Sequence, residues 1–166
     1  HLQRNKVRRV QPLCRLIHSV DSLRLAEEVQ ACGHEDRPPT DVLVQVNISN
    51  EKDKYGVAPA AAEHLVEQML SMPDVRVRGL MFMGAKSDDP EVIRPIFERA
   101  REIFADVQKS CEPERFDILS MGMTQDYEIA IECGANVVRV GSGISGSPSA
   151  EQVEAEEAST SGRIIR

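Results

Sequence analysis

The segments Leu119-Ser-Met-Gly-Met-Thr124 and Asn136-Val-Val-Arg-Val-Gly-Ser-Gly143 decide the fold of this chain. In each, a short apolar strand is followed at once by a loop that contains glycine. Residues 125–134 between them predict a helix, with Thr124 as its N-cap, acidic residues in its first turn and Gly134 at its end. The order strand, loop, helix, strand and loop is typical of one parallel β/α unit.

Loops at the carboxyl ends of consecutive parallel strands lie side by side. Both loops offer free backbone N–H groups and hydroxyls, from Ser120, Thr124 and Ser142, which are the groups that bind an oxyanion or a phosphate. Glycine loops that only make turns are equally compatible with this spacing. Arg139 favours a ligand, because a guanidinium among valines is costly to bury without an acceptor, although a structural ion pair would also satisfy it.

The composition is that of a single globular domain in a chain of 166 residues. The net charge of −7 argues against nonspecific binding to nucleic acid or to anionic membranes. No apolar run is long enough to cross a bilayer, and no signal-peptide pattern is present. The cysteines are dispersed without metal-ligand spacing, which argues against a zinc site or a disulfide scaffold and favours a reducing cytoplasm. They are Cys14, Cys32, Cys111 and Cys133.

Apolar runs and helical periodicity predict an alternating order of strands and helices along the chain. The predicted strands are 16–20, 42–48, 75–83, 118–119 and 137–140. The predicted helices are 22–30, 59–72, a long helix from about 90 to 107 that Pro95 breaks or restarts, and 125–134. Such an order means a parallel sheet with helical crossovers, either open and doubly wound or part of a (β/α)8 barrel.

The composition changes at residue 147, where small and acidic residues replace the apolar pattern. We therefore divide the chain into a domain of residues 1–146 and a tail of residues 147–166. The tail is expected to be disordered or marginally helical, and a partner-binding role for it is the less favoured interpretation.

A series of short motifs occurs in order along the domain and resembles the pyridoxal phosphate homeostasis protein family, whose fold is similar to the N-terminal barrel domain of alanine racemase. The motifs are His1-Leu-Gln-Arg-Asn-Lys6, His18-Ser-Val-Asp21, Val44-Gln-Val-Asn-Ile-Ser49, Lys54-Tyr-Gly56, Arg78-Gly-Leu-Met81, Leu119-Ser-Met-Gly-Met-Thr124 and Val138-Arg-Val-Gly141. The resemblance covers about residues 1–146. It implies a (β/α)8-type (TIM-type) barrel, of which this chain forms a part.

The resemblance implies a cytoplasmic, monomeric protein that binds pyridoxal 5′-phosphate and hands it on to apo enzymes with little or no catalysis. It places Arg139 at the pyridine nitrogen, where a cation leaves that nitrogen unprotonated and weakens the ring as an electron sink. No catalytic residue and no metal site are expected. The residues implied to bind the phosphate are Ser120, Gly122, Met123, Thr124, Gly141 and Ser142.

The chain departs from the family pattern at both ends. The family's Schiff-base lysine lies on an early strand upstream of His1, and none of the lysines present matches it. We therefore expect a partial barrel with unpaired edges that cannot bind the cofactor covalently in the family's way. Such a chain is a fragment, an incomplete version, or a protein that needs another segment to close it. Ser145 stands where the family usually has phenylalanine.

Two enzyme classes are the alternatives. A pyridoxal phosphate-dependent racemase or decarboxylase needs an additional β domain and an acid/base group opposite the lysine, for which this chain lacks the length. Tyr127 is expected to pack or to line the site rather than to act as that base. A phosphosugar enzyme would need a carboxylate pair at the strand ends, and none is evident. His18 and His64 are interpreted as structural or exposed.

Overall fold

The computed structural model describes residues 1–49, 54–84, 87 and 89–146. Its sheet has five strands, all parallel, in the order β1-β2-β3-β4-β5. The strands are β1 (Leu16–Val20), β2 (Thr40–Val46), β3 (Val75–Phe82), β4 (Ile118–Met123) and β5 (Val137–Arg139). Spatial order follows chain order without a reversal, whereas a doubly wound sheet reverses at its switch point. The sheet is therefore part of a barrel.

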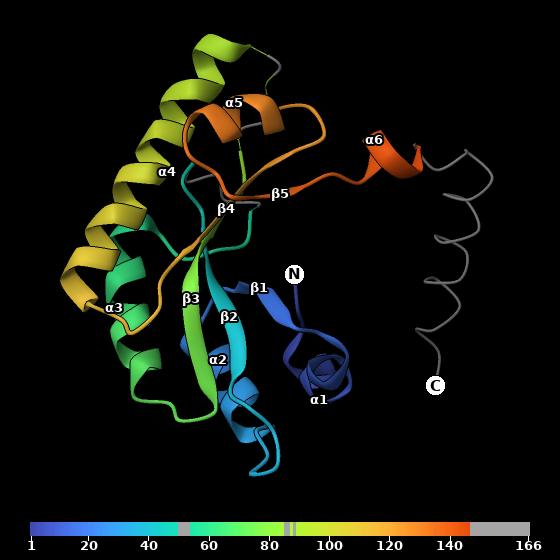
Figure 1. Ribbon diagram of the computed structural model, residues 1–166, viewed down its shortest axis with the longest axis vertical. Coiled ribbons are helices and arrows are strands. Elements are labelled where there is room, and N and C mark those ends of the chain that lie inside the picture. Colours follow the sequence, from blue (N-terminus) through green and yellow to red (C-terminus); the bar gives the residue numbers. More distant parts are fainter. Residues whose placement is uncertain (50–53, 85–86, 88, 147–166) are drawn as a thin grey trace.

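Helices connect the strands in the predicted alternation. They are α2 (Leu23–Ala31), α3 (Pro59–Leu70), α4 (Pro90–Cys111) and α5 (Tyr127–Glu132), and short turns of helix lie at α1 (Val7–Val10) and α6 (Ser142–Ser145). Figure 1 shows α3 and α4 side by side along one face of β2 and β3. In the part of the chain that the structure describes, no helix combines the length and apolarity that a bilayer span requires. Residues 147–166, the predicted tail, lie outside the described residues, and the boundary at residue 146 stays a prediction.

The predicted break in the long helix at Pro95 was wrong. Helix α4 runs unbroken from Pro90 to Cys111, with Asp89 as an N-cap whose carboxylate accepts the Glu91 N–H at 3.0 Å. Pro95 is exposed, whereas Ile93 and Phe97 on the opposite side of the helix are buried in the core. Packing of this apolar face stabilises the helix more than one lost backbone hydrogen bond destabilises it.

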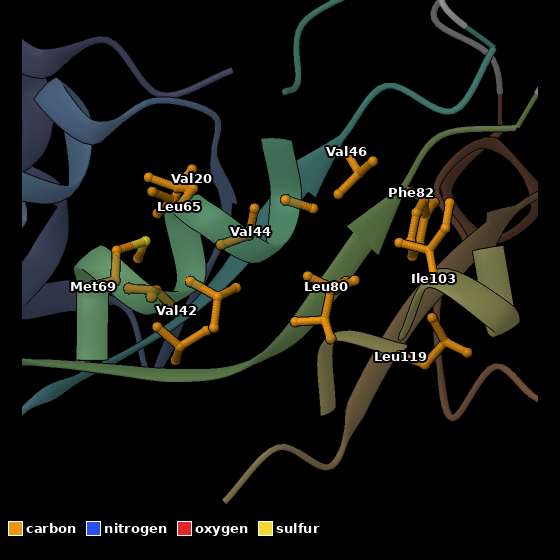
Figure 2. Packing of buried hydrophobic residues seen from close by; sticks show 14 of the residues in the cluster. Val20, Val42, Val44, Val46, Leu65, Met69, Leu80, Phe82, Ile103 and Leu119 are labelled. Carbon is orange, nitrogen blue, oxygen red and sulfur yellow. The ribbon is translucent and has the colours of Figure 1, made fainter. Parts of the chain in front are cut away.

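Alternation along the strands separates an outer apolar layer from an inner face, which carries both apolar residues such as Leu43 and polar ones. Val42, Val44 and Val46 of β2 belong to the buried apolar cluster between sheet and helices, in which Val42 and Val44 lie near Leu65 and Met69 of α3 (Figure 2). The residues that alternate with this layer point to the opposite, concave face of the sheet. On that face the strands carry polar side chains: His18, Gln45, Ser120 and Arg139.

A buried arginine joins three strands near their amino ends. Arg78 is 7% exposed and donates to Asp41 of β2 at 2.7 Å and to Asp117, beside β4, at 2.7 Å. Val42 pairs with Val77 and Leu43 pairs with Gly79, so Arg78 is the extra residue of a β-bulge. A bulge re-aims a side chain, and here it turns the guanidinium towards both carboxylates.

The hydrogen bonds of Arg78 with Asp41 and Asp117 make the unfolding free energy of the protein depend on pH. Burial raises the pKa of Asp117, but hydrogen bonds from Arg78 and Arg115 lower it by more, so this pKa is below its ordinary value. Asp117 therefore makes its full contribution to the unfolding free energy at pH values above the pKa that this carboxylate has in the unfolded chain. The contribution is lost as the pH falls through the lower pKa of the folded chain.

We expect the chain to lose more unfolding free energy than an Asp117→Asn variant when the pH falls from about 7 to about 3. The difference should be about 1 kcal/mol or less, because the Asp117 side chain is 47% exposed and solvent screens the pair. Urea unfolding at the two pH values measures this difference. Equal losses in both proteins would contradict the role given to Asp117.

Candidate functional site

Strand β4 continues through the segment that the sequence predicted as a loop. The predicted strand end at Leu119 was wrong, since β4 runs to Met123 and Ser120 is fully buried within it. Gly122 has a φ of +91° and lies against α5, where a Cβ would come within 2.6 Å of the Ala130 Cβ. The glycine therefore serves a close approach of strand to helix, and the polar loop begins only after Met123.

The helix after β4 begins later than predicted, so Thr124 is not its N-cap. The N-cap is Asp126, which is 8% exposed, and its carboxylate accepts the Met123 N–H at 2.6 Å. This contact closes the turn between β4 and α5 without using the Thr124 hydroxyl. The hydroxyl is therefore available to the neighbouring loop.

The loops after β4 and β5 meet at Thr124, as their adjacency in the sequence analysis predicted. Thr124 Oγ1 accepts the Gly141 N–H at 3.3 Å and the Gly143 N–H at 3.4 Å, and the Ser142 hydroxyl lies 3.2 Å from it. Gly143 is held closely, because a Cβ there would lie 2.9 Å from Thr124 Cγ2. We call these four residues the loop cradle. Two backbone amides and two hydroxyls converge there, on an exposed surface.

Arg139 ends β5 on the concave face, where it donates to Ser120 Oγ at 2.8 Å and to the Phe82 carbonyl at 2.9 Å. Burial lowers the pKa of Arg139, and the Asp126 carboxylate partly restores it. Within the described residues Arg139 makes no ion pair, so the structural ion pair that the sequence left open is not formed there. The guanidinium is fixed by neutral acceptors and keeps its positive charge.

His18 belongs to the same cluster, although the sequence analysis interpreted it as structural or exposed. Its Nδ1 lies 3.2 Å from Ser120 Oγ, so Ser120 stands between an imidazole and a guanidinium. Burial and then the charge of Arg139 lower the pKa of His18, which favours the neutral imidazole. The sequence held two signals for His18: a polar residue within the short strand β1, and its place at the start of the motif His18-Ser-Val-Asp21.

Ser120 and Gly122 thus lie in a strand, Thr124, Gly141 and Ser142 belong to the loop cradle, and Arg139 lies on the concave face beside Ser120. Met123, the last residue of β4, is 44% exposed. No group of three metal-ligating side chains occurs among the described residues. The arrangement suits a ligand with an anionic group for the cradle and an acceptor for the guanidinium.

Residues 2–148 match the sequence model of the family described as alanine racemase, N-terminal domain. The chain belongs to this family. Within it, the chain is similar to pyridoxal phosphate homeostasis proteins, as the sequence motifs predicted. It is 40% identical over 140 residues to that of Aquifex aeolicus, covering 84% of this chain and 61% of the relative. To that of Escherichia coli K12 it is 38% identical over 149 residues, covering 88% of this chain and 62% of the relative. The chain thus spans about three fifths of these curated relatives' length.

Solved structures of other proteins have a similar fold. PipY of Synechococcus elongatus, solved with PLP bound, is 30% identical with a TM-score of 0.77, covering 87% of this chain and 66% of PipY. Alanine racemase of Clostridium difficile, in complex with cycloserine, is 13% identical with a TM-score of 0.71, covering 93% of this chain and 42% of the enzyme. At that identity the likeness shows the fold alone. The family match and these structures together confirm that the chain forms part of a barrel.

Proposed function

We propose that this chain binds pyridoxal 5′-phosphate and carries it, with little or no catalysis of its own. Family membership supports a cofactor of this kind, and PipY is a relative solved with PLP bound. The observation that carries the proposal is the convergence of the Gly141 and Gly143 amides on Thr124 Oγ1. We further propose that the recipients are apo enzymes that use the same cofactor.

The cradle supplies what a phosphate needs. Thr124 and Ser142 offer hydroxyls, and Gly141 and Gly143 offer backbone N–H groups that now share one hydroxyl acceptor. Phosphate oxygens are stronger acceptors for such amides than a hydroxyl, because they carry charge. We assign Ser120 to holding Arg139, and not to the phosphate as first expected, because its hydroxyl already accepts from the guanidinium.

Arg139 determines what chemistry the site favours. A bound pyridoxal phosphate supplies an electron sink, which works best when the pyridine nitrogen is protonated. A guanidinium can only donate, so Arg139 beside that nitrogen would hold it in the unprotonated form. Ser120 and the Phe82 carbonyl keep the guanidinium in place. The site therefore favours holding the cofactor over activating it.

The racemase or decarboxylase alternative needs an acid/base group facing the ring. Both tyrosines are engaged elsewhere, since the Tyr127 hydroxyl donates to Glu128 at 3.2 Å and Tyr55 stacks on His1 with ring centroids 3.8 Å apart. The resemblance to the family predicts in addition that none of the chain's lysines corresponds to the family's Schiff-base lysine. We therefore propose that the residues of this chain hold the cofactor through noncovalent contacts.

Replacing Thr124 by valine tests the cradle. The change removes the hydroxyl on which both loops converge, so affinity for pyridoxal phosphate and for inorganic phosphate should each fall about tenfold. Calorimetric titration with both ligands measures this. Ser71→Ala is the control, because it removes an exposed hydroxyl, far from the cradle in the chain, that donates to the Gln68 carbonyl at the end of α3. Unchanged affinity of Thr124→Val for both ligands would refute the proposed phosphate site.

A further inference from the structure

A cavity of about 390 Å³ opens at the end of the sheet opposite the cradle. Its walls are the approach to β1, the loop between α2 and β2, and the first residues of β2 and β3. We propose that this cavity binds a phosphorylated organic anion of about the size of a mononucleotide. The proposal does not depend on the cofactor site, with which the cavity shares no residue.

The charge of the cavity is positive although the chain is acidic. Arg15, Arg37 and Arg76 line it, and Asp41 is the one acidic residue among the lining residues that the structure describes. Asp41 is already shared by Arg76 and Arg78. Its negative charge is thus offset by its two guanidinium partners.

Arg15 and Arg37 are the two groups left for a ligand. Both are exposed, and neither makes an ion pair or side-chain hydrogen bond within residues 1–49, 54–84, 87 and 89–146. A guanidinium pairs with a phosphate through two parallel N–H donors, so two arginines at one cavity match a dianionic phosphate monoester. The net charge of the chain is −7, so an anion would be repelled by most of the molecule. The arginines of the cavity supply the local positive charge that would attract it.

Hydrogen bonds hold one wall of the cavity in place, and the cavity is large enough for more than a phosphate. Gln11 Nε2 donates to Thr40 Oγ1 at 2.7 Å and to the Val29 carbonyl at 3.3 Å, which ties the segment before β1 to α2 and β2. Pro12, Pro38 and Pro39 add apolar surface of fixed shape to the lining. The volume lies within the usual range of small-molecule sites, and an inorganic phosphate would fill only a small part of it. An organic group on the phosphate would pack against the proline rings.

Adenosine monophosphate is the probe, titrated calorimetrically beside adenosine and inorganic phosphate. The parent chain should bind adenosine monophosphate more tightly than either, and the double variant Arg15→Ala/Arg37→Ala should lose about tenfold or more of that affinity. The variant should keep its affinity for pyridoxal phosphate. Arg24→Ala removes an exposed arginine of α2 outside the cavity and should change nothing.

Two outcomes of this titration overturn the proposal. One is that the parent and the double variant bind adenosine monophosphate equally, or not at all. The other is that Thr124→Val abolishes this binding, which would assign the nucleotide to the cradle. If the proposed cofactor site is wrong and the cavity proposal is right, the parent chain will bind adenosine monophosphate but not pyridoxal phosphate.

Thiol labelling gives a second measurement without any substitution. Cys14 is exposed and lines the cavity, whereas Cys111 lies at the end of α4. Adenosine monophosphate should slow alkylation of Cys14 by iodoacetamide and leave that of Cys111 unchanged. Equal rates at Cys14 with and without the nucleotide, at concentrations where calorimetry shows binding, would place the ligand elsewhere.

Discussion

Replacing Gly79 by alanine is expected to cost about 4 kcal/mol or more of unfolding free energy. Gly79 has a φ of +152°, and a Cβ there would overlap the Ile118 carbonyl oxygen of the paired strand β4. The obstacle is backbone, which cannot move without breaking the β3–β4 pairing. Because small domains are stable by only about 5–15 kcal/mol, this single methyl group should remove much of the stability.

Urea unfolding followed by circular dichroism measures the loss. Gly141→Ala is the matched control, because Gly141 has a φ of −110° and no atom lies within 4 Å of a Cβ built there. That variant should stay within about 0.5 kcal/mol of the parent. A Gly79→Ala protein within about 1 kcal/mol of the parent would show that β4 can shift, and that the bulge does not require glycine.

The order of strands and helices could be predicted from the sequence because it depends on local patterns. Strand β1 spans the predicted residues 16–20, and β3 differs from its prediction by one residue at its end. Periodicity and apolar runs are properties of a segment by itself. The end of β4 was predicted wrongly because a glycine commonly marks a turn, whereas Gly122 lies within the strand and allows α5 to pack closely on it, a contact that is not visible in the segment.

The bulge at Arg78 shows the same limit. The alternation of Val75, Arg76, Val77 and Arg78 is typical of a strand with one solvent-facing side. Arg76 follows this pattern, with a side chain that is 45% exposed. Arg78 departs from it, because Asp41 of β2 and Asp117, which precedes β4, accept hydrogen bonds from its guanidinium. The sequence pattern of one strand does not reveal which residues of the neighbouring strands will contact its side chains.

In the candidate site, too, the features that follow from chain order were predicted, whereas contacts between residues distant in the sequence were not. That two loops would meet followed from parallel β/α connection, and the contacts of Thr124 with the second loop confirm it. His18 was missed, because its partner Ser120 is 102 residues away in the chain. The roles of Ser120, Arg139 and the cradle residues in binding a cofactor stay predictions.

Replacing Arg139 by alanine should separate ring binding from phosphate binding. The variant loses the charged donor proposed for the pyridine nitrogen, so affinity for pyridoxal phosphate should fall between about tenfold and a hundredfold, the range of a charged hydrogen bond. Affinity for inorganic phosphate should stay within about twofold, because the cradle donors come from Thr124, Ser142 and backbone amides. Arg99→Ala, which removes an exposed arginine paired with Glu102, should change neither affinity.

The comparison between variants decides what the Arg139 result means. Thr124→Val should weaken both ligands, whereas Arg139→Ala should weaken only the ligand that has a ring. Equal loss of phosphate and cofactor affinity in Arg139→Ala would mean that the guanidinium acts by its charge or by supporting the loops. Arg139→Lys distinguishes these cases, because lysine keeps the charge but cannot reach Ser120 and the Phe82 carbonyl with one planar fork. If the lysine variant binds pyridoxal phosphate as weakly as the alanine variant, the fixed direction of the guanidinium, more than its charge, holds the ring.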